Sequence, residues 1–274
     1  MRLVDSHCHL QSDRVAGQAE QLAGAARLAG VERILVPGWN VTSSEAALEL
    51  VRGLPWLDAA VGVHPHDAAS VDDAAWARIV ELARDPSVVA IGETGLDYDR
   101  RFSPIEAQLE NLRRNLRLAR ETDRPVILHC RSAAGARDAQ DALLREVTAV
   151  PGVRPLVHSF SGPPDYARGM LDLGATISFS GLVFRAGEEA SAEVARLTPV
   201  DRVLVETDTP FLAPPSAPRR RNEPAFVAIT ATWLAGVRDA PPEELGPQVV
   251  ATYERLFGAR DGDRPAGVSA GPPV

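Results

Sequence analysis

Short apolar and β-branched segments alternate with longer stretches of helical periodicity along almost the whole chain. Short apolar runs bounded by turn residues indicate buried strands, and apolar residues three and four apart indicate amphipathic helices. Eight strands are predicted in this way: Leu3–Asp5, Arg33–Val36, Leu57–Val63, Val88–Gly92, Val126–His129, Pro155–His158, Ala175–Phe179 and Arg202–Glu206. Eight strand–helix units in 274 residues predict an α/β fold, a single-domain (β/α)8 TIM barrel.

Helical periodicity fills the intervals between these strands and continues after the last one. The predicted helices are Gln18–Ala29, Ser44–Gly53, Asp73–Arg84, Ile105–Thr122, Gly135–Val150, Asp165–Leu173, Glu189–Leu197, Pro224–Val237 and Glu243–Leu256. An open, doubly wound sheet is the alternative, but no glycine-rich phosphate-binding loop follows an early strand. We expect the barrel to span residues 1–258. The segment 259–274 is rich in Gly, Pro and Asp, and we expect it to be a disordered tail.

All six histidines lie at or just after the carboxyl end of a predicted strand. His7 and His9 follow the first strand, and the others are His64, His66, His129 and His158; Glu93 and Asp208 follow the fourth and eighth strands. In an α/β barrel these strand ends form one rim, where active sites are built. Residues two apart in an extended segment point the same way, so His7 and His9 can converge on one ion. We therefore predict a metal site at this rim.

Composition restricts the partners and the compartment of the protein. A net charge of -8 is unsuited to coating duplex DNA through many phosphate contacts, although local binding of a nucleic-acid end stays open. The two cysteines, Cys8 and Cys130, provide no disulfide framework and indicate a reducing cytosol. We interpret both as packing residues, because strand alternation turns Cys8 away from the flanking histidines. No secretory segment or bilayer-spanning run is found, so we expect a cytoplasmic protein without membrane contact.

The chemistry of the candidate ligands is mixed imidazole and carboxylate, without thiolate. Such a set suits Mg, Mn or Zn and does not select among them. Four histidines and two carboxylates exceed what one ion needs, whereas two divalent metal ions bridged by a carboxylate use them well. A scaffold that keeps a metal only for stability predicts a closed ligand set, and the surplus of ligands argues against it.

Several motifs in a fixed order resemble those of TatD-type deoxyribonucleases, a branch of the amidohydrolase superfamily. The resemblance runs from Leu3 to about Phe257. It rests on Asp5-Ser6-His7-Cys8-His9-Leu10, Gly62-Val63-His64-Pro65, Gly92-Glu93-Thr94-Gly95-Leu96-Asp97-Tyr98, His129-Cys130-Arg131, His158-Ser159-Phe160-Ser161-Gly162, Glu206-Thr207-Asp208-Thr209-Pro210 and Asn222-Glu223-Pro224. Each motif alone is weak, but their joint occurrence in this order is specific.

The resemblance implies a particular ligand set for two ions. One ion would be held by His7, His9 and Asp208, the other by His129 and His158, with Glu93 between them. Glu93 stands where many amidohydrolases carry a carboxylated lysine, which favours the TatD branch over the lactonase and phosphotriesterase branches. Asp208 would take the proton from the attacking water. We interpret His64 as a catalytic residue that hydrogen-bonds a substrate phosphate or the water, and its alternative is a structural histidine.

The activity implied is that of a 3′-5′ exodeoxyribonuclease on single-stranded or frayed DNA, with a role in DNA repair. We expect a monomer whose partner is DNA. The exonuclease direction comes from the resemblance alone. The alternative is an esterase or deacylase that acts on a small molecule or on aminoacyl-tRNA with the same metal site, because fold does not fix substrate.

Candidate substrate contacts are cationic and aromatic side chains after the strands. They are Arg131, Arg185, Arg219, Arg221 and Phe160, with Phe184 as a second aromatic. Arginines can reach phosphates and aromatic rings can stack on a terminal base. The alternatives are a solvated charge run for Arg219–Arg221 and loop packing for the aromatics. The roles of His66 and Glu206 stay open between orienting a ligand histidine and ordinary structural contacts.

Overall fold

The computed structural model describes residues 1–218 and 221–259. Its strands form one parallel sheet in the order β1 to β8. They are β1 (Leu3–Asp5), β2 (Val31–Pro37), β3 (Leu57–Val61), β4 (Val88–Asp97), β5 (Val126–Arg131), β6 (Pro155–Val157), β7 (Thr176–Phe179) and β8 (Val203–Val205). The two ends of the sheet meet next to β1 and β8. There the N–H of Ser6 donates to the carbonyl of Val205 at 3.1 Å, and the backbones of Cys8 and Thr209 form an isolated parallel β-bridge. The predicted (β/α)8 barrel is confirmed.

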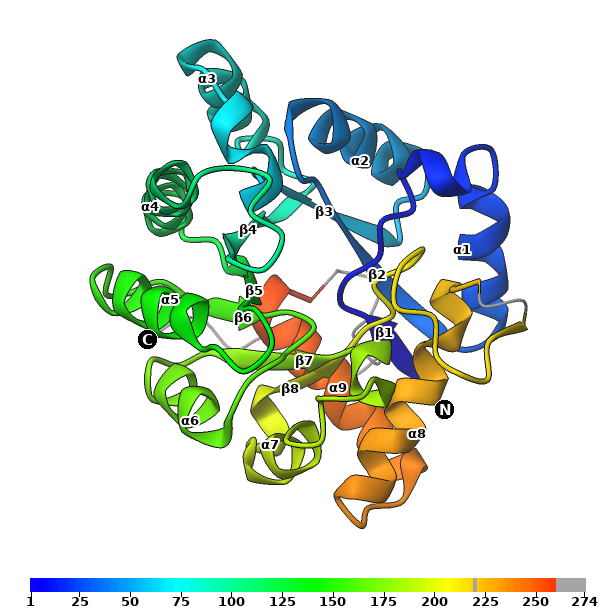
Figure 1. The fold of residues 1–274 in the computed structure, drawn as a ribbon. Helices are drawn as coiled ribbons and strands as arrows, with labels where there is room; N and C mark the ends of the chain where they lie inside the picture. Colours follow the sequence, from blue (N-terminus) through cyan, green and yellow to red (C-terminus); the bar gives the residue numbers. More distant parts are fainter. Residues whose placement is uncertain (219–220, 260–274) are drawn as a thin grey trace, which may run out of the picture.

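Helices surround the barrel, as Figure 1 shows. They are α1 (Ala19–Leu28), α2 (Val41–Gly53), α3 (Asp73–Leu82), α4 (Ile105–Glu121), α5 (Asp138–Thr148), α6 (Pro164–Asp172), α7 (Ser191–Leu197), α8 (Val227–Val237) and α9 (Pro242–Phe257). Their buried residues recur at helical spacing, as in Leu112, Leu116 and Ala119 of α4. Together with the buried strand residues they form one continuous apolar core.

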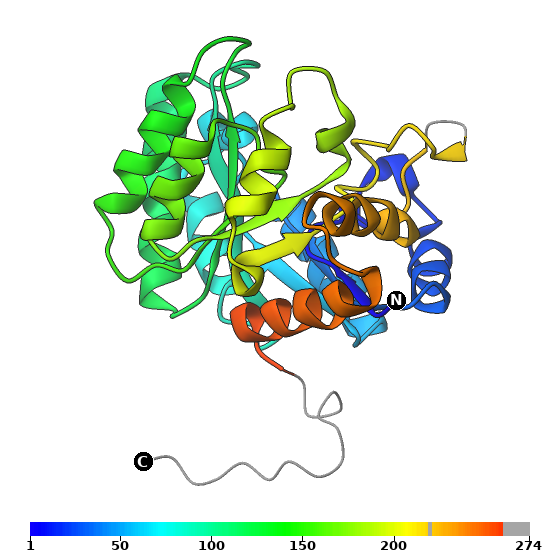
Figure 2. The ribbon, with the colours of Figure 1, turned by 90° about the horizontal axis from the view of Figure 1, so that it is seen from below.

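The amino ends of the strands are covered by α9, which lies beneath the barrel in Figure 2. Buried polar contacts among three residues hold this helix against the barrel. Arg33 on β2 donates from Nε to Asp58 on β3 at 2.8 Å, and the hydroxyl of Tyr253 on α9 donates to the same carboxylate at 2.7 Å. The guanidinium of Arg33 also lies 5.1 Å from the Tyr253 ring centroid. With this end covered, the site lies at the carboxyl ends of the strands.

The predicted strand and helix boundaries differ from the observed ones mainly on β4 and in the loops. The prediction that this strand ends at Gly92 is wrong, because β4 continues to Asp97 and carries Glu93 inside it. Short 3₁₀ helices after β1, β3 and β7 were not predicted: Asp13–Val15, Pro65–Ser70 and Gly181–Phe184. The expected disordered tail, 259–274, falls outside the described residues except at residue 259. Within the described ranges, no helix has the length and hydropathy of a membrane span.

Candidate metal centre

The chain segment after β1 brings two imidazoles to one point. His7 and His9 are both buried, and their Nε2 atoms lie 3.1 Å apart. Cys8 between them is fully buried and its backbone forms a β-bridge with Thr209, and its thiol belongs to none of the groups of ligand atoms found among the described residues. Asp208 completes the first group. Its Oδ1 atom lies 3.4 Å from His9 Nε2 and 3.8 Å from His7 Nε2.

A backbone hydrogen bond holds Asp208 in this position. Its N–H donates to the carbonyl of His7 at 2.9 Å, and its φ of 58° turns the chain in the left-handed region. Asp is among the few residue types that adopt this conformation readily. The eighth strand is thereby joined to the segment after the first, which places a carboxylate beside both imidazoles.

Glu93 lies between this group and a second one. Its Oε2 atom is 3.2 Å from His7 Nε2. Its other oxygen, Oε1, is 2.8 Å from His158 Nε2 and 3.3 Å from His129 Nδ1. One carboxylate therefore offers a separate oxygen to each histidine group, which is the arrangement of a bridging ligand.

Close approach of β4 to β5 puts Glu93 next to His129. Gly95 has a φ of +139° and pairs with His129 across the two strands. A Cβ atom at Gly95 would lie 1.9 Å from the His129 carbonyl oxygen, so only glycine permits this approach. The same feature interrupts the strand pattern, which is why the sequence did not predict the second half of β4.

Outer hydrogen bonds decide which ring nitrogen of each histidine faces the centre. His9 Nδ1 lies 3.3 Å from the carbonyl oxygen of Pro37, and His158 Nδ1 lies 3.2 Å from Glu206 Oε1. These oxygens accept, so Nδ1 carries the proton and Nε2 keeps its lone pair for the centre. His129 is reversed: its Nε2 faces the Asp97 carboxylate, 3.4 Å from Oδ2 and outside hydrogen-bond geometry, and its Nδ1 faces Glu93.

His64 differs from these histidines in its tautomer. Its Nδ1 accepts a hydrogen bond from the backbone N–H of His66 at 3.1 Å, so the neutral ring carries its proton on Nε2. That nitrogen lies 3.3 Å from Glu93 Oε1 and points an N–H at the centre instead of a lone pair. His66 turns outward from the centre, where its Nε2 lies 2.7 Å from Asp97 Oδ2.

The electrostatics of the cluster favour added positive charge. Burial opposes ionisation of Glu93, yet the charge of His158 and the hydrogen bond from His129 hold its pKa well below the usual value. Asp208 is also buried, but its hydrogen bond with His9 lowers its pKa. Burial lowers the pKa of His64 to about 4. Burial opposes protonation of His158, yet Glu93 and Glu206 raise its pKa well above the usual value, so without a cation its Nε2 also holds a proton, which a bound cation would replace.

These residues fit divalent cations. Three overlapping groups bring ligand atoms within 4.8 Å of one another: His7, His9 and Asp208; His7, Glu93 and His158; and His64, Glu93 and His129. His158 Nε2 is buried and lies 2.8 Å from Glu93 Oε1, close enough for one cation to contact both atoms. Imidazoles held by outer carboxylates and carbonyls, together with ionised carboxylates, are a common donor set for such ions.

Two acidic residues next to the ligands have structural partners. Glu206 lies beside His158, as described, and accepts a bond from the Ser6 hydroxyl at 3.3 Å. It therefore contacts a candidate ligand histidine, and none of the arginines that the structure describes is paired with it. Asp5 accepts from the backbone and hydroxyl of Thr207 at 2.9 and 2.6 Å, and burial raises its pKa to about 8. Asp5 joins β1 to the segment that carries Asp208.

The residues predicted to contact the substrate differ in their exposure and contacts. The stacking role predicted for Phe160 is wrong, because its side chain is 1% exposed and packs on Tyr166 inside the protein. Arg131 ends β5 and is half-buried, and Arg185 follows the 3₁₀ helix after β7. Arg221 is exposed and donates to Gln18 at 2.8 Å. Arg219 lies outside the described residues.

Two residues missed by sequence reasoning lie against the cluster. Phe102 packs against His66 and Phe211 against His9, with ring centroids 4.7 and 5.9 Å apart. Both lie in irregular loops, where no periodic pattern marks a side chain as exposed or buried. The amino-acid sequence alone therefore did not indicate that either phenylalanine lies beside the histidines.

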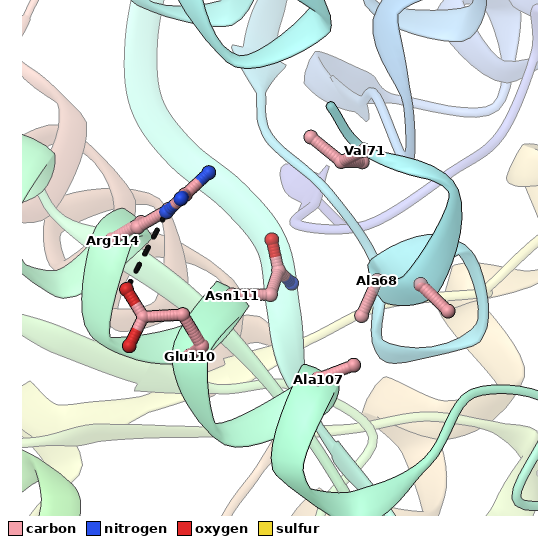
Figure 3. Close-up of a pocket in the computed structure, with 7 residues that line it drawn as sticks. Ala68, Val71, Ala107, Glu110, Asn111 and Arg114 are labelled. Carbon is pink, nitrogen blue, oxygen red and sulfur yellow. Dashed lines mark ion pairs between the residues drawn. The ribbon is translucent and has the colours of Figure 1, made fainter. Parts of the chain in front are cut away.

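A separate hollow of about 220 Å³ lies on the flank of the barrel between the Pro65–Ser70 helix and α4. Figure 3 shows its lining of small apolar side chains, with Asn111 and the Glu110–Arg114 ion pair at its wall. Asn111 donates to the carbonyl of Val63 at 2.7 Å and so holds α4 against the end of β3. The hollow contains none of the candidate ligands and is distinct from the metal centre.

A buried cluster of imidazoles and carboxylates at the carboxyl rim of a (β/α)8 barrel defines a class, the metal-dependent hydrolases. The sequence model of the TatD related DNase family matches residues 4–258. The chain belongs to this family, and the resemblance predicted from its motifs is confirmed.

Individual relatives are similar over almost their whole length. The uncharacterized metal-dependent hydrolase YabD of Bacillus subtilis (strain 168) is 35% identical over 258 residues, covering 93% of this chain and 98% of that protein. The 3′-5′ ssDNA/RNA exonuclease TatD of Erwinia billingiae (strain Eb661) is 37% identical over 268 residues, with the same coverage. The crystal structure of YJJV, a TatD homolog from Escherichia coli K12, has a TM-score of 0.86 at 28% identity, covering 94% of this chain and 99% of that chain.

Proposed function

We propose that this protein hydrolyses phosphodiester bonds of single-stranded nucleic acid from the 3′ end, with two divalent cations of the Mg, Mn or Zn type. One observation carries the proposal: the two oxygens of Glu93 face two different histidine groups, at 3.2 Å from His7 and 2.8 Å from His158. The relatives named 3′-5′ ssDNA/RNA exonuclease support the substrate class and the direction.

Each ligand has an assigned place in the proposal. His7, His9 and Asp208 would hold one cation, His129 and His158 would hold the other, and Glu93 would be shared by both. Bound divalent cations supply Lewis acidity, which stabilises charge on the phosphoryl oxygens and lowers the pKa of the attacking water. The outer partners Pro37, Glu206 and Asp97 fix the ring orientations that this requires.

Two side chains of the cluster act on the substrate and on the water. The lowered pKa of Asp208 keeps its carboxylate ionised at neutral pH, so it accepts the proton of the attacking water. His64 is neutral at this pH and presents an Nε2–H, so it donates a hydrogen bond to a phosphoryl oxygen as charge builds there. Neither role requires a change of protonation before the reaction.

The test compares wild type with Glu93→Gln on a single-stranded oligonucleotide labelled at either end. Wild type is expected to shorten the 5′-labelled strand stepwise when Mg²⁺, Mn²⁺ or Zn²⁺ is supplied. Glu93→Gln keeps the side-chain shape but loses the charge shared by both groups, so we expect loss of turnover and a lower metal content. Circular dichroism checks that the variant is folded. Small esters and aminoacyl-tRNA run in parallel, and wild type that cleaves only those substrates contradicts the proposal.

A further inference from the structure

Two aromatic side chains are left in solvent at the rim that carries the metal centre. Among the described residues, the exposed large hydrophobic side chains are Met1, Leu28, Phe102, Val200 and Phe211, and only two of these are aromatic. Phe102 is 67% exposed and follows β4, whereas Phe211 is 39% exposed and follows β8. The chain thus leaves its two exposed aromatic rings at the mouth of one site.

The rings of the site form an unbroken row with these two phenylalanines at its ends. Successive centroid distances are 4.7 Å for Phe102–His66, 4.3 Å for His66–His64, 4.6 Å for His64–His129, 5.7 Å for His129–His158, 3.8 Å for His158–His7, 4.8 Å for His7–His9 and 5.9 Å for His9–Phe211. Phe102 follows β4 and Phe211 follows β8, which are four strands apart in the eight-stranded barrel, so the two rings lie on opposite sides of the candidate ligands. A phosphodiester held at the cluster has one exposed ring on each side.

One ring has a cation over its face, and an arginine is next to the other ring in the sequence. The guanidinium of Arg14 lies 4.9 Å from the Phe211 centroid. Arg101 precedes Phe102 and donates from Nε to the carbonyl of Tyr98 at 2.8 Å. Neither arginine forms an ion pair with an acidic residue in the part of the chain that the structure describes, so both charges are available to phosphates. An aromatic ring beside an unneutralised cation is the combination that binds single-stranded nucleic acid.

We propose that Phe102 and Phe211 stack on the two bases that flank the scissile phosphodiester. This inference rests on the proposed function and adds a substrate requirement: unpaired bases on both sides of the bond. Stacking on a ring face needs no particular base, so it gives affinity for single strands without sequence preference. Both phenylalanines contact nucleotides at a distance from the reacting atoms, so they are expected to act on KM and not on kcat.

The experiment pairs protein variants with substrate variants. Phe102→Ala and Phe211→Ala are assayed on a single-stranded oligonucleotide, and on versions that lack the base of the terminal or of the penultimate nucleotide. Each alanine variant is expected to raise KM for the complete oligonucleotide roughly 5- to 100-fold, with kcat within about twofold of wild type. In the variant that has lost the matching ring, removal of that base has no further effect, because the same contact is missing already.

Binding gives a second readout that does not depend on turnover. The dissociation constant of a fluorescein-labelled phosphorothioate oligonucleotide, measured by anisotropy, is expected to rise as KM does, and Phe102→Trp and Phe211→Trp are expected to restore it. Leu28→Ala is the matched control, since this side chain is 93% exposed at the end of α1 and its loss leaves KM unchanged.

The outcomes separate this inference from the function on which it rests. If wild type digests the oligonucleotide and both alanine variants keep its KM and dissociation constant, the stacking role is refuted and the nuclease proposal stands. If wild type neither binds nor digests any oligonucleotide, the proposed function fails, and the stacking role fails with it.

Discussion

Replacement of Gly95 by alanine is expected to damage the barrel and the metal centre together. A Cβ atom at this position would lie 1.9 Å from the carbonyl oxygen of His129, and real Cβ atoms stay at least about 3.0 Å from such an atom. The strands β4 and β5 must therefore separate by at least about 1 Å at this point. The φ of +139° adds strain for any residue with a side chain.

The expected cost follows from these two effects. Backbone strain in this region is about 1–3 kcal/mol, and each strand hydrogen bond that is lost adds about 1 kcal/mol. With about two such hydrogen bonds lost, Gly95→Ala should lower the free energy of unfolding by about 3–5 kcal/mol. His129 moves with its backbone, and metal ligands tolerate shifts of only about 0.2 Å. We expect the affinity of the His129 group for its ion to fall at least about tenfold.

Urea unfolding followed by circular dichroism measures the stability, and calorimetric titration with Mn²⁺ measures the affinity. Gly24→Ala is the matched control, because it makes the same chemical change at an exposed position of helix α1. No atom lies within 4 Å of the new Cβ there. It should raise the free energy of unfolding by about 0.5–1 kcal/mol. The reasoning is refuted if Gly95→Ala unfolds at the wild-type urea concentration and binds Mn²⁺ as tightly as wild type.

Three further outcomes are expected. Glu206→Gln weakens the orientation of His158 and should lower metal affinity about 10- to 100-fold, measured by calorimetry, and unchanged affinity contradicts an orienting role. Addition of Mn²⁺ at about 100 times its dissociation constant should stabilise the fold by about 2.7 kcal/mol in a thermal melt, and EDTA should reverse it; a melting temperature indifferent to both argues against a metal centre. Burial raises the pKa of Cys130 to about 12 and that of Cys8 well above its usual value, so at pH 8 iodoacetamide should modify them at least about 100-fold more slowly in native protein than in urea, and equal rates refute this.

Much of the candidate site was predictable because its candidate ligands lie in or shortly after locally recognisable strands. His7, His129 and His158 come at or directly after short buried segments, and parallel strands of one barrel bring such ends together without further information. Glu93 was identified through its motif, but its strand was predicted to end too early. Glycines and a glutamate depart from the β-branched pattern of a strand, and close contact with β5 determines the conformation there.

The positions of the aromatic side chains near the site, by contrast, could not be predicted from the sequence. Phe160 lies three residues after β6 and was predicted at the rim, but it packs against Tyr166 and Phe179 in the core. Phe102 and Phe211, to which no pattern assigned a role, are exposed beside the histidines. Whether a ring in a loop points outward depends on neighbours from other segments, which no local sequence pattern encodes.

The amino-acid sequence by itself determined the barrel and the rim on which its histidines and carboxylates gather, because periodicity and strand ends are local properties. Only the tertiary structure decided how those groups face one another. The partner of His158 is 48 residues away in Glu206, and the partner of His9 is the carbonyl of Pro37. Such contacts set which nitrogen keeps its lone pair, and they exist only once distant segments have packed together.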